Sequence, residues 1–186
     1  MDITKRSFMS FLWRFIAIFL CLLFHIGLIS CSTSEKPLNS KAVERAGGKY
    51  IPKADIEKMT KVADQRIYVP VYAHIYYGGD MIYDLTTTLS IRNTDSKHPI
   101  YISSARYYNT PGNLIRDFLE SSVLLPPMAT LDYVVSERER TGGSGANFVV
   151  EWFSTDQVSE PIVESVMIGT SGQQGISFVS EGKVVK

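Results

Sequence analysis

Short runs of β-branched and aromatic residues, separated by turn signals, fill the chain from Arg66 onward. In the run DLTTTLSIRN, the residues Leu85, Leu89 and Ile91 lie on one face at a period of two, which is the pattern of a strand with one buried face. Clusters of glycine and proline mark the turns between runs. Eight such runs are found within about 120 residues: 66–77, 84–93, 99–109, 113–119, 129–137, 147–154, 161–170 and 175–185.

Eight short strands with a turn every dozen or so residues predict an all-β fold, an immunoglobulin-like β-sandwich of two antiparallel sheets. A domain spanning residues 66–186 is large enough to bury one hydrophobic core. Pro70 lies inside the first run, and proline has no N–H group to donate to a strand ladder. We therefore expect an edge position or a bulge at Pro70.

Residues 1–30 have the features of an export signal. Basic residues precede an uncharged apolar run of 15 residues, 15–29, which is shorter than the ~20 residues that a membrane-spanning helix needs. The run ends in Leu28-Ile29-Ser30-Cys31, which resembles the lipobox of bacterial lipoproteins. The resemblance implies cleavage before Cys31 and acylation of this cysteine, with palmitate among the attached chains. The alternative is an uncleaved signal anchor.

A lipid on Cys31 implies a protein held at the cell membrane or the outer membrane, with its domain outside the cytoplasm. One acyl chain binds a membrane only marginally, whereas lipoproteins carry two or three, which suffices for a stable anchor. Ser32 follows the cysteine, where an aspartate would signal retention at the inner membrane. We therefore expect a membrane partner through the lipid, with the outer membrane favoured.

The remaining composition excludes several classes of function. The other cysteine, Cys21, lies within the signal, so the mature chain has no disulfide and no thiolate for zinc or redox chemistry. The whole chain carries 19 Lys and Arg and 19 Asp and Glu; the signal holds three basic residues and one acidic, so the mature part carries 16 and 18, a net charge of −2. Without a basic excess, no nucleic-acid partner is expected. His74 and His98 have no metal-ligand spacing, so neither a metal nor a cofactor is expected.

Residues 31–65 form a polar stretch that we interpret as a tether between the lipid and the domain. In the segment KADIEKMTKVAD, 53–64, Ile56, Met59 and Val62 fall on one helical face. A short helix that packs on the domain and a solvated linker helix are both compatible with this pattern.

The stretch TGGSGANFVVEW, 141–152, is the most conspicuous motif of the chain. A phosphate-binding loop would need a lysine after its glycines, which is missing. A nucleophile elbow at Ser144 would need a helix behind it, whereas the sequence predicts a strand. The remaining interpretations are a turn in which the glycines supply positive φ, and an anion-binding loop with Arg138 and Arg140 beside it.

The first run is crowded with tyrosines. At a period of two, Tyr72, His74 and Tyr76 share a face, which would suit stacking on a sugar ring or a peptide. Cross-strand packing with exposed hydroxyls is the alternative. Elsewhere, Glu151 lies between apolar neighbours, so we expect it on the polar side of its sheet or paired with an arginine such as Arg92 or Arg106.

Seven blocks of the chain are similar to a family known as the domain of unknown function numbered three-one-two-four. They are YVPVYAHIYYG, LTTTLSIRNTD, PIYISSARYYNTPG, LPPMATLDYVV, GGSGANFVVEW, EPIVESVMIGT and QGISFVSEGKV. The resemblance covers about residues 66–186 and implies an exported, lipid-anchored, single-domain protein. It implies no chemistry, because the family has no established activity.

Two classes of function remain. The first is a non-catalytic envelope module that binds a protein, peptide or glycan, or that has a structural role. The second is a ligand-binding protein or a hydrolase that uses the glycine loop. A concave pocket that unites Ser144, Asn147 and a histidine would favour the second class, whereas a plain turn would favour the first.

Overall fold

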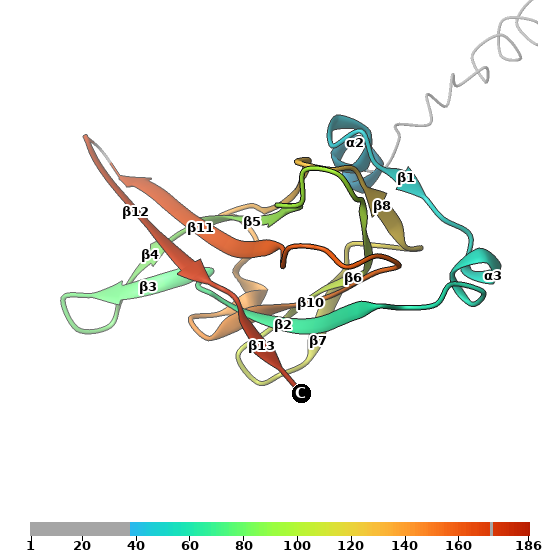
Figure 1. Cartoon of the computed structure of the whole chain (residues 1–186). Coiled ribbons are helices and arrows are strands. Elements are labelled where there is room, and N and C mark those ends of the chain that lie inside the picture. Colours follow the sequence, from blue (N-terminus) through green and yellow to red (C-terminus); the bar gives the residue numbers. More distant parts are fainter. Residues whose placement is uncertain (1–37, 172) are drawn as a thin grey trace, which may run out of the picture. The chain divides into compact units, whose positions relative to one another are not determined.

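Alternating apolar residues build two antiparallel sheets that pack face to face in the computed structural model (Figure 1). The structure describes residues 38–171 and 173–186, which fall within one compact unit, Lys36–Lys186. The all-β antiparallel sandwich predicted from the sequence is confirmed. The export signal and Cys31 lie outside the described residues.

The larger sheet has seven strands, and its central strand is the one that follows the glycine loop. Its order is β1 (Lys49–Tyr50), β8 (Val123–Leu125), β6 (Ile100–Tyr108), β10 (Ala146–Ser154), β2 (Ala63–Val71) and β13 (Lys183–Val185), with β7 (Leu114–Asp117) also paired to β6. Only residues 66–68 of β2 pair with β13, so β2 has an open edge beside Pro70. This open edge is the position that the proline predicted.

The second sheet has four strands, in the order β12 (Gln174–Glu181), β11 (Ile162–Ser171), β5 (Thr86–Arg92) and β9 (Thr130–Val135). A separate hairpin of β3 (His74–Tyr77) and β4 (Met81–Asp84) extends from the sandwich beside the β11–β12 hairpin (Figure 1). The 3₁₀ helix η1 (Arg140–Gly142) lies just before the glycine turn.

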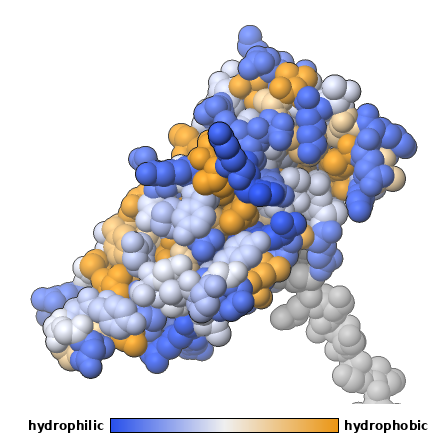
Figure 2. Space-filling model, turned by 90° about the horizontal axis from the view of Figure 1, so that it is seen from below, coloured by the Kyte–Doolittle hydropathy of each residue, from blue (hydrophilic) through white to orange (hydrophobic). Residues whose placement is uncertain are grey.

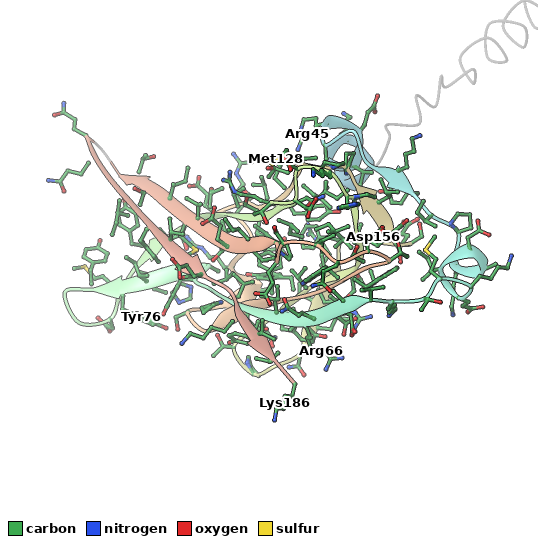
Figure 3. The ribbon with its side chains drawn as sticks, viewed as in Figure 1. Arg45, Arg66, Tyr76, Met128, Asp156 and Lys186 are labelled. Carbon is green, nitrogen blue, oxygen red and sulfur yellow. The ribbon has the colours of Figure 1, made fainter. Side chains whose placement is uncertain are left out.

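The core lies between the two sheets, where side chains fill the space (Figure 3). Val69 and Phe148 from the larger sheet and Leu89 and Ile91 from the smaller one are fully buried. Each such side chain contributes about 1.5–3 kcal/mol by leaving water. Their positions at every second residue explain why period-two alternation predicted these strands.

The segment before the sandwich differs from the predicted tether. Helix α2 (Leu38–Arg45) packs Ala42 and Val43 into the core cluster, and Arg45 binds Asp132 of β9 at 2.9 Å. Of the short helix expected within 53–64, one turn forms, α3 (Lys53–Ile56), and it has no buried residues. The helix does not continue through Met59 and Val62, because a longer helix is stabilised mainly when its apolar face packs on the domain, and Val62 stays 52 % exposed. No helix among residues 38–171 and 173–186 is long and apolar enough to cross a membrane.

The first predicted strand, 66–77, is interrupted after Val71. At this point the amide of Ala73 donates to the carbonyl of Gly143, and the carbonyl of Ala73 accepts from Leu85. These bonds take the backbone away from β10 and direct it into the β3–β4 hairpin. The predicted strand is therefore two strands with different neighbours, β2 and β3.

Candidate functional site

The glycine motif spans the end of η1, a turn over residues 143–145 and the start of β10. Its turn forms hydrogen bonds with two neighbouring loops. The carbonyl of Gly142 accepts from the amide of Thr110 at 2.9 Å, and the amide of Gly145 donates to the hydroxyl of Thr110 at 3.0 Å. The carbonyl of Gly143 accepts from Ala73. These bonds hold the turn against the corner between β2 and β3 and against the loop after β6.

The glycines of this motif serve different purposes. Gly143 has a φ of +76°, as the sequence interpretation expected. At Gly142 the reason is space, because a Cβ there would lie 1.9 Å from the hydroxyl oxygen of Tyr107. Tyr107 is fully buried and its hydroxyl has no hydrogen-bond partner within the described structure. Position 142 is therefore glycine because no side chain fits there beside the buried ring of Tyr107.

Ser144 pairs with neither of the two histidines that the structure describes, His74 and His98. Both ring nitrogens of His74 are buried without a hydrogen-bond partner in the described part of the chain, and Nδ1 of His98 lies 3.3 Å from Asp95 in a separate turn. Asn147 lies on β10, opposite Pro70 and Tyr108. Neither Ser144 nor Asn147 lines the clefts described below. The hydrogen bond that would activate a serine nucleophile is thus not formed.

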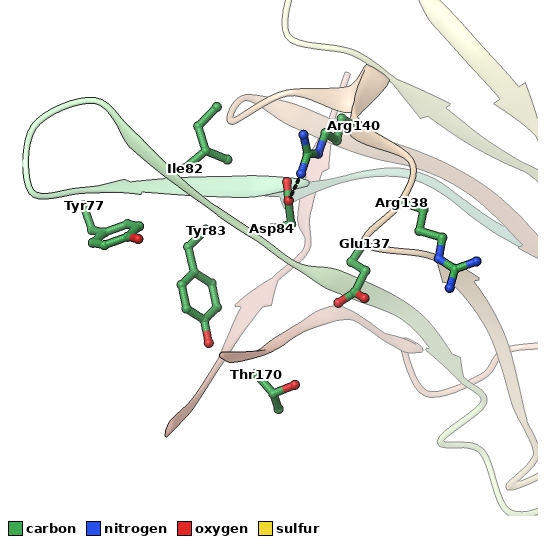
Figure 4. A pocket seen from close by; sticks show the side chains of 8 residues that line it. All are labelled: Tyr77, Ile82, Tyr83, Asp84, Glu137, Arg138, Arg140 and Thr170. Atoms are coloured by element: carbon green, nitrogen blue, oxygen red, sulfur yellow. Dashed lines mark hydrogen bonds and ion pairs between the residues drawn. The ribbon is translucent and has the colours of Figure 1, made fainter. Parts of the chain in front are cut away.

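A cleft of about 630 Å³ lies between the β3–β4 hairpin, the segment after β9 and the end of β11 (Figure 4). It is lined by Tyr77, Ile82, Tyr83, Asp84, Glu137, Arg138, Arg140 and Thr170. Its volume is within the usual range of small-molecule sites, ~300–1,000 Å³. Two of the predicted site residues, Arg138 and Arg140, therefore belong to one hollow.

Tyrosine rings from the hairpin form one end of this cleft. Tyr77 and Tyr83 meet edge to face with their ring centroids 6.2 Å apart, and Tyr77 is 50 % exposed. In the view of Figure 4, the ring of Tyr83 points toward Thr170. An exposed aromatic ring beside polar groups is a common feature of ligand sites.

The predicted aromatic face is divided by the break between β2 and β3. Tyr72 packs edge-on against Phe178, whereas His74 is buried and contacts Tyr76 edge-on. None of the three lines the cleft, which uses Tyr77 from the opposite face of the hairpin. Sequence reasoning missed Tyr83, although Gly78-Gly79-Asp80 between two aromatic runs is a hairpin signal.

The charged groups of the cleft fall into a paired set and an unpaired set. Arg140 forms an ion pair with one oxygen of Asp84, and the other oxygen, Oδ1, is buried without a hydrogen-bond partner in the described chain. The side chains of Glu137 and Arg138 form no hydrogen bond or ion pair with any described residue. In Figure 4, Glu137 lies between Tyr83 and Arg138.

Arg138 differs in this respect from the other arginines of the described chain. Those six are each ion-paired: Arg45 with Asp132, Arg66 with Glu151, Arg92 with Glu164, Arg106 with Asp117, Arg116 with Glu139 and Arg140 with Asp84. Arg138 thus keeps its guanidinium donors free at the cleft.

A second cleft, of about 510 Å³, lies where β2, β10 and β13 meet. Glu151 lies there, directly opposite Arg66, and the two side chains bind at 2.7 Å. Glu151 lies on the less buried face of β10 and pairs with an arginine, as expected, but register places Arg66, not Arg92 or Arg106, opposite it. Burial alone would raise the pKa of Glu151, but hydrogen bonds from Arg66 and Ser104 outweigh it and lower the pKa. Seen from below in Figure 2, hydrophobic and hydrophilic side chains are interspersed on this side of the domain.

Comparisons with known proteins place the chain in a family without assigning it an activity. No curated protein matches the sequence. A solved structure from Thermotoga maritima, titled "Crystal Structure of Thermotoga maritima 1070", is similar at a TM-score of 0.39 with 11 % identity, over 64 % of this chain and 92 % of that one. The family described as "Protein of unknown function (DUF3124)" matches residues 64–185. Because this match covers most of the chain and nearly all of the described sandwich, the chain belongs to that family.

Proposed function

We propose that this protein is a lipid-anchored module of the cell envelope that binds a ligand, without catalysis, in the cleft between the β3–β4 hairpin and the Glu137–Arg140 segment. The anchor is proposed from the apolar signal and the Leu28-Ile29-Ser30-Cys31 motif. Binding outside the cytoplasm follows from export, since the lipid holds the domain at the membrane surface.

One observation carries the binding role. The cleft brings together side chains from three separate parts of the chain, and among them Glu137 and Arg138 have no partner in the described structure. The half-exposed ring of Tyr77 and the partly buried ring of Tyr83 lie in the same hollow. Free charges beside aromatic surface contribute little to folding, so their convergence in a hollow supports a role in recognition.

The cleft can be tested by placing a photo-crosslinking amino acid at Tyr77 in the full-length protein in cells. Tyr50 on β1 is exposed to a similar degree and lies outside the cleft, so it provides the matched control position. We expect a discrete crosslinked product from position 77 that position 50 does not give. Identical products from both positions would count against the cleft.

The anchor needs a separate test. Replacing Cys31 by serine removes the thiol that accepts lipid, so the protein should move from the membrane fraction to the soluble fraction. If Cys31→Ser remains in the membrane fraction, the uncleaved signal anchor is the better explanation. This result would leave the role of the cleft open to the crosslinking test.

A further inference from the structure

We infer that the ligand of this cleft is an acidic saccharide, with a sugar ring against the tyrosines and an acidic group on Arg138. The inference rests on the proposed binding function and specifies its ligand. Three features of the cleft carry it: the tyrosine end, the cluster of free acceptors and the unpaired guanidinium.

The tyrosine end suits the apolar face of a pyranose ring. Such a ring presents C–H groups on its face and hydroxyls around its rim, and the negative face of an aromatic ring attracts C–H groups. Tyr77 is half exposed and Tyr83 lies beside it, so a sugar can reach aromatic surface without displacing core residues. The hydroxyl of Thr170 lies at the same end of the cleft and can donate or accept.

The middle of the cleft offers acceptors that receive no hydrogen bond from the described chain. Glu137 is a carboxylate without a partner, and Oδ1 of Asp84 is buried and unpaired among the described residues. A saccharide supplies several hydroxyl donors in a small volume, whereas an extended peptide supplies one backbone donor per residue.

Arg138 favours the binding of an acidic saccharide over a neutral one. Its planar guanidinium carries five donors and binds a carboxylate or phosphate in a two-pronged arrangement. Six other arginines of the described chain each form an ion pair with a carboxylate, whereas the side chain of Arg138 pairs with no described residue. An acidic substituent on the sugar would therefore pair with Arg138, as the protein's own carboxylates pair with its other described arginines.

The experiment is a calorimetric titration of the full-length protein in detergent micelles with four kinds of probe. The acidic probes are oligosaccharides built from galacturonate, glucuronate or muramate. The others are a neutral galactose oligomer, citrate as a carboxylate without a sugar, and pentaglutamate as an acidic peptide. We expect saturable binding of at least one acidic oligosaccharide, with the neutral oligomer about tenfold weaker or more. Equal binding of the neutral oligomer, tighter binding of citrate or pentaglutamate, or no binding of any acidic oligosaccharide would overturn the inference.

Two pairs of variants locate the binding. Arg138→Gln should lower affinity for the acidic oligosaccharide by about tenfold or more and leave the neutral one unchanged, whereas Arg45→Gln, on α2 outside the cleft, should change neither. Tyr77→Ala should weaken both saccharides, whereas Tyr76→Ala, on the opposite face of the hairpin, should not. Equal losses within either pair would contradict the proposed pose. A discrete crosslink from position 77 without acidic saccharide binding would leave the binding function standing and remove only the saccharide.

Discussion

The hydroxyl oxygen of Tyr107 lies where the Cβ of any other residue at position 142 would be, so alanine in place of Gly142 would collide with it. The added Cβ would lie 1.9 Å from the hydroxyl oxygen of Tyr107, 2.8 Å from its Cζ and 3.1 Å from the Cβ of Ala146. Tyr107 is fully buried and packs on Phe148 with ring centroids 5.0 Å apart, so it has little room to move. Overpacking of a core costs about 1–3 kcal/mol. For a domain of this size, Gly142→Ala should lower the Tm by roughly 2–12 °C.

A second substitution separates this collision from other effects. The hydroxyl of Tyr107 has no described hydrogen-bond partner, and burial raises the pKa of Tyr107 to about 12. Tyr107→Phe alone should therefore be neutral or slightly stabilising. In the Gly142→Ala background it should recover about 1 kcal/mol, because it removes the closest atom; the contact with Cζ would remain.

The assay is urea denaturation followed by tryptophan fluorescence, since Trp152 is buried in the core. Gly175→Ala is the matched control, because its Cβ would meet only ordinary contacts at 3.6 and 3.8 Å. The control should stay within about 0.5 kcal/mol of the parent. Unfolding of Gly142→Ala at the parent's urea midpoint, or an unchanged cost with Phe at position 107, would contradict the predicted collision.

Two further predictions concern the turn after β5 and helix α2. Asp95 accepts backbone hydrogen bonds from Lys97, His98 and Ser159, which hold its pKa at about 2; the stability that this carboxylate contributes is present above pH ~4 and is lost as the pH falls to about 2. Asp95→Asn should therefore unfold at lower urea at pH 7 and show a flatter dependence of the midpoint between pH 4 and 2, and an unchanged pH profile would contradict this assignment. Val43→Ala should cost about 1–3 kcal/mol in the same assay, because its side chain is 2 % exposed, whereas Val62→Ala should cost less than about 0.5 kcal/mol. Equal costs would mean that α2 is not part of the core.

Much of the sandwich could be predicted because a strand's buried face repeats every second residue. Leu89 and Ile91 show this repeat, and both are core residues of β5. The open edge beside Pro70 was likewise predictable, since proline lacks the donor that a paired strand needs. Helix α2 was missed because its sequence, LNSKAVER, has three apolar residues, too few to produce a clear helical period, although Ala42 and Val43 join the core.

Local patterns determined the strands and the turns, and the sequence contains no cysteine after Cys31. Tertiary structure decided which strands are neighbours, and so which side chains meet. Register gave Glu151 its partner Arg66, and the bonds of Ala73 turned the hairpin so that Tyr77 and Tyr83 share a cleft with Arg138. Residues far apart in sequence are brought together only by sheet pairing and loop contacts. The alternation of residues along one strand shows which side chains share a face, but it does not show which strand lies beside them.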